Sequence, residues 1–141
     1  MGRNDVTMLA REVHIRHWTI LFLFSFDSSD WESIYDALLW ADAPDVIIDK
    51  VAENVRADFL NEGFTYSNED ARITIFAISE ASSGPEVLDS TVHEIIHIVQ
   101  HIAYKDSLDM FSEDVAYLGG DISRAISDIV CLLSCPHCHR R

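Results

Sequence analysis

The chain has 141 residues and a formal net charge of −14, from 24 acidic and 10 basic side chains. This length predicts a single domain, and a hydrophobic fraction of 48% is sufficient for one core. The strong negative charge repels phosphate backbones, so we expect no nucleic-acid partner. The charge suits either a basic partner or a solubilising acidic surface.

The sequence predicts a soluble, cytoplasmic protein. No apolar signal segment follows the first basic residues. The most apolar run, residues 18–26, is shorter than the roughly 20 residues that a membrane-spanning helix requires. We therefore expect no membrane partner.

The first half of the chain predicts strands and two helices. Residues 12–26 are rich in β-branched and aromatic types and predict one strand. Residues 30–41 and 45–61 carry apolar side chains at helical spacing. Residues 64–67 are a short strand candidate, and residues 72–79 alternate as a clearer strand.

Two longer helices are predicted in the second half. The first begins near Pro85 or Ser90 and ends at about Tyr104. The second covers about residues 112–134 and is loosened at residues 119–120, which are both glycine. Together with the strands, these helices predict an α+β fold.

The first of these helices contains the sequence HEIIH, which begins at His93. Residues four apart lie on one face of a helix, so His93 and His97 can bind one zinc ion. Glu94 lies beside that ion and can take a proton from zinc-bound water. A catalytic zinc site needs a third protein ligand. Glu113 is the leading candidate because its helix has room to return antiparallel; His101 is an alternative, about 6 Å further along the axis.

The same residues have structural interpretations. His93 and His97 would then be partly buried histidines of an amphipathic helix, and Glu94 would be a solvated charge. Glu113 would complement the helix dipole. Asp121, near the helix face of Glu113, would either orient a ligand histidine or lie on the surface.

The segments "HEIIHIVQHI" and "EDVAYLGG" resemble the gluzincin branch of the zincin metallopeptidases. They are especially similar to small HExxH proteins of phage and bacterial origin. The resemblance covers residues 72–120. It implies Zn²⁺ bound by His93, His97 and Glu113, with Glu94 as the general base.

The resemblance also implies a fold and a reaction. Strand 72–79 would be the edge strand beside the cleft, with a peptide or protein substrate lying antiparallel to it. Tyr117, one turn after Glu113, could donate a hydrogen bond to substrate or to a ligand. We predict a zincin-like metallopeptidase domain over residues 1–134. It would hydrolyse a peptide bond with zinc-activated water, in a bacterial host cell if phage-encoded.

Two alternatives follow from the same features. One is a non-catalytic acidic protein on a zincin scaffold that targets a basic host protein, as the charge of −14 suggests. The other is a different HExxH protease class, in which His101 replaces Glu113 as the third ligand.

The cysteines gather at the end of the sequence, at positions 131, 135 and 138. Their odd number argues against a disulfide framework. The run "CPHCH" matches the form of c-type haem attachment, but that chemistry requires export. We predict a flexible tail with reduced thiols over residues 135–141.

Overall fold

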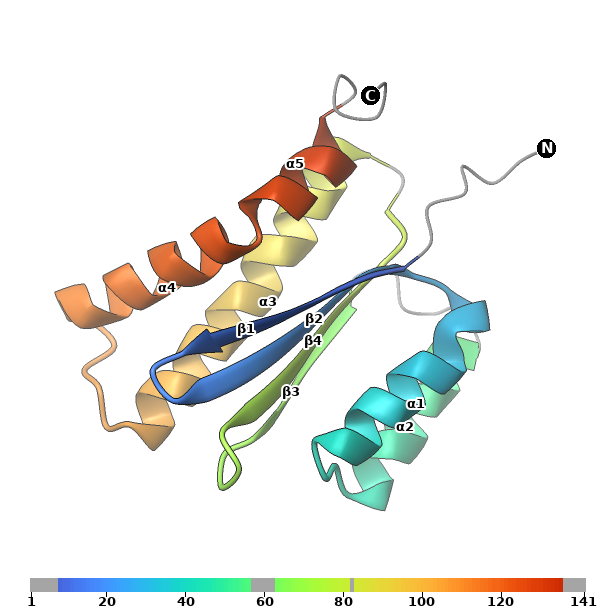
Figure 1. The fold of residues 1–141 in the computed structure, drawn as a ribbon, viewed down its shortest axis with the longest axis horizontal. Coiled ribbons are helices and arrows are strands. Elements are labelled where there is room, and N and C mark those ends of the chain that lie inside the picture. Colours follow the sequence, from blue (N-terminus) through green and yellow to red (C-terminus); the bar gives the residue numbers. More distant parts are fainter. Residues whose placement is uncertain (1–7, 57–62, 82, 136–141) are drawn as a thin grey trace.

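The computed structural model describes residues 8–56, 63–81 and 83–135. Within these residues the chain forms a four-stranded mixed sheet between two layers of helices (Figure 1). The strands are β1 (Leu9–Ile15), β2 (Trp18–Phe26), β3 (Gly63–Asn68) and β4 (Ile73–Ser79). The helices are a short 3-10 helix, η1 (Ser28–Asp30), and the α-helices α1 (Trp31–Trp40), α2 (Asp45–Arg56), α3 (Gly84–Lys105), α4 (Glu113–Ala125) and α5 (Ser127–Ser134). The predicted α+β class is confirmed.

The strand order is β1-β2-β4-β3, so β1 and β3 are the edges of the sheet. β1 pairs with β2, and β3 with β4, in antiparallel hairpins, whereas β2 and β4 run parallel. The prediction that strand 72–79 is the edge strand is therefore wrong, because this segment forms the interior strand β4. Its residues Ile75, Phe76 and Ala77 are all fully buried, as expected for a strand covered on both faces.

The single strand predicted over residues 12–26 is divided into two. The chain turns at Arg16 and His17, whose φ angles are +51° and +63°. Positive φ at both central residues is typical of the tight turns that join antiparallel strands. Such positions usually carry asparagine and glycine, so Arg16 and His17 give no turn signal in the sequence.

Two hydrophobic clusters fill the spaces on either side of the sheet, because successive side chains of a strand point to opposite faces. On the side of α3, α4 and α5, the ring of Phe76 lies 4.8 Å from that of Phe22 and 5.3 Å from that of Phe24. On the side of α1 and α2, Leu23 and Ile75 pack among the helical residues. The sheet is therefore held from both faces.

α3 begins at the first of the two predicted positions. The Ser83 side chain accepts a hydrogen bond from the backbone N–H of Glu86, and Pro85 occupies the first turn. Gly84 packs closely against the backbone of Ser134 at the end of α5. This contact fixes the start of the helix that carries the HExxH motif.

The helix predicted over residues 112–134 is two helices. α4 continues through both glycines and ends at Ala125, and α5 begins at Ser127, so the break lies at Ile126. The predicted helix over 45–61 is confirmed as far as Arg56, and its remainder lies outside the described residues. The predicted tail also lies outside them, apart from Cys135. None of the helices in the described ranges combines the length and the apolar character needed to cross a membrane.

Candidate metal centre

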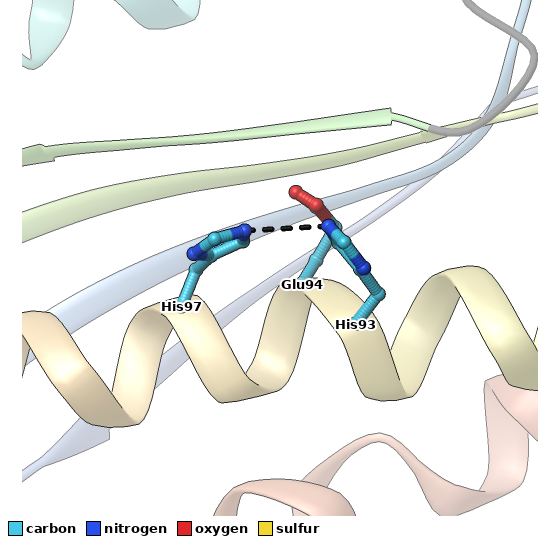
Figure 2. A group of neighbouring side chains, drawn as sticks. All are labelled: His93, Glu94 and His97. Carbon is cyan, nitrogen blue, oxygen red and sulfur yellow. Dashed lines mark hydrogen bonds between the residues drawn. The ribbon is translucent and has the colours of Figure 1, made fainter.

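The histidines of the HExxH motif lie on the side of α3 that faces the sheet. Figure 2 shows His93, Glu94 and His97 projecting from α3 on this side. β3 is the strand next to them, because its Thr65 hydroxyl contacts Glu94. The centre is thus formed where one helix passes beside an edge strand.

The two imidazoles are arranged as a pair of metal ligands would be. The Nε2 atom of His93 lies 3.3 Å from the Nε2 atom of His97. Two Zn–N bonds of about 2.0–2.1 Å at a tetrahedral angle separate their nitrogens by about 3.3–3.4 Å. The spacing is thus compatible with one shared zinc ion, and it is equally that of the hydrogen bond between the two rings in Figure 2.

Glu94 completes the group. One ligand atom from each of His93, Glu94 and His97 lies within 4.8 Å of the other two. The side chain of Glu94 is buried, with 5% exposed, and the Thr65 hydroxyl lies 3.3 Å from its Oε1 atom. The carboxylate is therefore close to a metal held by the histidines and is shielded from bulk solvent.

His101 stands one turn beyond His97 but has a different set of contacts. Its Nδ1 atom lies 2.6 Å from the Ser67 hydroxyl, which lies 2.7 Å from the hydroxyl of the buried Thr74. The indole N–H of Trp18 donates to Thr74 at 2.7 Å. Because an indole only donates, Thr74 accepts this bond. Either hydroxyl can be the donor between Thr74 and Ser67, and the role of Nδ1 depends on the tautomer of His101.

This chain of hydrogen bonds ties the His101 ring to β3 and β4. Burial lowers the pKa of His101, and the nearby His97 lowers it further, against an opposing effect of Glu69. His101 does not belong to the converging group. We therefore assign it to the hydrogen-bonded wall beside the centre rather than to the ligands.

Glu113 is placed apart from the histidines. α4, which it begins, packs against a side of α3 that includes Ile95 and Val99. Each of these is two residues from His97 and lies about 160° around the helix from it. Among the described residues, the converging group does not include Glu113. Its role as third ligand remains a prediction.

The remaining predicted site residues are also on α4. Glu113 is exposed in the first turn, where a carboxylate is favourable for the helix dipole. Tyr117 is 66% exposed and Asp121 is exposed. The structure brings together His93, Glu94 and His97, and it does not bring these three α4 residues into that group.

Two residues of β3 that were not predicted from the sequence contribute to the site. Thr65 contacts Glu94, and Ser67 contacts His101. Both are in the segment predicted only as a short strand. Their spacing of two places them on the same face of a strand, which was the available signal.

Comparisons of the chain with known protein families, with curated proteins and with solved structures find no match. The resemblance to gluzincins therefore rests on the motif residues alone.

Proposed function

We propose that this protein is a zinc-dependent peptidase with its metal held by His93 and His97. The observation that supports this most strongly is the 3.3 Å separation between the Nε2 atoms of these two residues. It agrees with the separation of about 3.3–3.4 Å for two nitrogens on one tetrahedral zinc. The net charge of −14 also favours the approach of a cation.

The chemistry that zinc supplies when bound is Lewis-acid activation of a water molecule for attack on a carbonyl. Glu94 is the general base in this proposal. Its carboxylate takes a proton from the attacking water and gives it to the leaving amine. The position of Glu94 beside the imidazoles, within 4.8 Å, supports this role.

An extended peptide is the proposed substrate. β3 lies at the edge of the sheet and flanks the centre through Thr65. The backbone of an edge strand can pair with an added strand, which would align a peptide beside His93 and His97. The edge role that we predicted for residues 72–79 is thus proposed for β3.

Zinc content and turnover test the proposal together. Purified wild-type protein should contain about one zinc per chain. Glu94→Gln should retain that zinc and lose peptide hydrolysis, because the amide cannot accept the proton. Asp89→Asn, at an exposed site one turn earlier on α3, is the matched control and should stay active. A zinc-free wild type that takes up no metal would overturn the proposal.

A second comparison identifies the third ligand. Glu113→Ala should lower zinc retention if the carboxylate binds the metal, as the resemblance implies. His101→Ala should leave zinc retention nearly unchanged, because His101 lies outside the group that converges on the proposed metal position. Zinc loss in His101→Ala with none in Glu113→Ala would reverse this assignment. Dialysis against a graded zinc buffer measures both.

The acidic binding protein is a second candidate, favoured by the net charge of −14. It predicts capture of a basic protein that weakens with added salt and is unchanged by Glu94→Gln. The peptidase predicts that the same variant abolishes function. The two proposals thus differ in the effect of one substitution.

A further inference from the structure

A pocket of about 660 Å³ lies at the end of the sheet where three parts of the chain meet. These parts are the β1–β2 turn, the entry to β4 and the end of α3, which lie near one another in Figure 1. The residues that line the pocket are Arg16, His17, Arg72, Lys105, Asp106 and Ser107. None of them belongs to the candidate metal centre.

The charge of this lining is opposite to that of the whole chain. Three of the ten arginines and lysines of the protein line the pocket, together with one carboxylate, that of Asp106. The chain as a whole carries −14. The residues that line the pocket therefore carry a positive sum of charge, although the exposed carboxylates of Asp70 and Asp114 lie within 4 Å of two of its cations.

The backbone at this pocket is also unusual. Most residues avoid positive φ, where glycine is common and asparagine, aspartate and histidine are enriched. The described part of the chain has six non-glycine residues with positive φ, and four of them line the pocket. These four are Arg16 (+51°), His17 (+63°), Arg72 (+55°) and Ser107 (+54°). Two of the four, Arg16 and Arg72, carry long basic side chains at positions that such residues rarely occupy, which indicates a use for those side chains.

The ion pairs around the pocket leave two of the cations accessible. Arg72 is held by Asp106 and lies over the ring of Trp18, 5.9 Å from its centroid. Arg16 is 3.9 Å from Asp114 and Lys105 is 3.8 Å from Asp70, whose side chains are 68% and 101% exposed. Exposed pairs of this length contribute little, so an anion can replace these carboxylates.

We propose that this pocket binds a small molecule through a phosphate group. A phosphate dianion matches this set of cations better than a single carboxylate does, and the two accessible cations, Arg16 and Lys105, offer N–H donors to it. The volume exceeds that of a free phosphate and lies in the range of small-molecule sites. The site is independent of the metal centre, because Lys105 lies about 12 Å beyond His97 along α3.

The test is calorimetric titration of the full chain at constant ionic strength with inorganic phosphate, with AMP and with acetate. Wild-type protein should bind inorganic phosphate and AMP more tightly than acetate. Tighter binding of AMP than of phosphate would assign the site to a phosphorylated organic molecule. Equal affinities for the two would assign it to inorganic phosphate. Absence of phosphate and AMP binding, or equal binding of acetate, would overturn the proposal.

The decisive variant combines Arg16→Asn with His17→Gly. Asparagine and glycine suit this turn, so the thermal midpoint should rise. Phosphate and AMP should bind about tenfold more weakly or worse, because a charge-assisted contact is removed. Lys105→Gln should also weaken both, whereas Arg124→Gln, an exposed change on α4, should not. Unchanged affinity for phosphate and AMP in both the turn variant and Lys105→Gln would contradict the proposal.

Discussion

Glu94 differs from the histidine before it in its exposure to solvent. His93 is exposed, whereas the Glu94 side chain is buried. A buried carboxylate has lost most of its hydration, so its orientation depends on its protein contacts. One of these contacts is the Thr65 hydroxyl on β3. Thr65 is therefore a positioning residue for the proposed base.

Replacing Thr65 by valine should expose this dependence. The shape is nearly unchanged but the hydroxyl is lost, so turnover should fall by roughly tenfold, the loss expected for one hydrogen bond to a charged group. Zinc content should not change, because neither imidazole is altered. Thr65→Ser, which keeps the hydroxyl, should retain most of the activity. A fully active valine variant would contradict the role of Thr65.

His101 gives a pH dependence to the stability of the metal-free protein. Its pKa is lowered by burial and by His97, so the folded state binds fewer protons than the unfolded state, where the pKa is about 6.5. The free energy of unfolding should therefore decrease as the pH falls through about 6.5 and level off below the folded pKa.

Urea unfolding at about pH 7.5 and about pH 5.5, on either side of the unfolded histidine pKa, measures this effect. His101→Gln should show a smaller loss of stability between the two conditions than the wild type does. His14→Gln, at an exposed position in β1, is the control and should behave as the wild type. An equal loss in His101→Gln would contradict the prediction.

Among the elements, those with strong local signals were predictable. Pro85 marked one of the two predicted starts of α3, and the apolar spacing in residues 30–41 predicted α1. The turn at Arg16–His17 was not predictable, because its residues carry no turn signal. The interior place of β4 was also missed, because strand order depends on which strands pair and not on the composition of one strand.

The candidate centre was predictable only where its geometry is local. The spacing of His93 and His97 on one helix determines that they share a face. The position of Glu113 depends on the path of the chain after α3 and on how α4 packs, which no local pattern determines. The contacts of Thr65 and Ser67 likewise depend on the pairing of β3 with β4.

Two helical glycines, Gly84 and Gly120, differ in the space around them. A Cβ atom at Gly84 would overlap the Ser134 carbonyl oxygen, whereas a Cβ at Gly120 would meet nothing within 4 Å. Gly120→Ala should therefore raise the free energy of unfolding by about 0.5–1 kcal/mol through its helix propensity. Gly84→Ala should lower it, because α3 and α5 must separate. Paired urea unfolding curves measure both, and the same sign for both variants would contradict this account.

For the whole molecule, the dominant physical property is its negative charge. The chain carries a net charge of −14 on 141 residues. Folding brings the excess acidic side chains closer together, and their mutual repulsion opposes the compact state. The described ion pairs relieve part of this repulsion locally. One of them joins Arg11 to Asp128, whose Nη2 and Oδ2 atoms lie 2.8 Å apart. With 10 cations for 24 carboxylates, fewer than half of the acidic side chains can each pair with a separate cation.

Added salt should therefore stabilise the metal-free protein. Raising the ionic strength from about 0.01 M to about 0.15 M shortens the Debye length from about 30 Å to about 8 Å, which screens the repulsion. The thermal midpoint should rise over this range. The same screening should weaken zinc binding, because it reduces the attraction of a cation to the chain. A midpoint that falls with sodium chloride would show that local ion pairs outweigh the net charge.

The parallel pairing of β2 with β4 has a consequence for the protein during its synthesis. Thr19 pairs with Ile73, so β2 leaves the ribosome long before its partner does. At about 5–20 residues per second, a delay of roughly 3–10 seconds separates the two strands. For that time the nascent β2, with buried aromatic residues such as Trp18 and Phe22, has β1 as its only available strand partner. Newly made chains are thus exposed to aggregation before the sheet closes, and their yield should depend on chaperones that shield apolar segments.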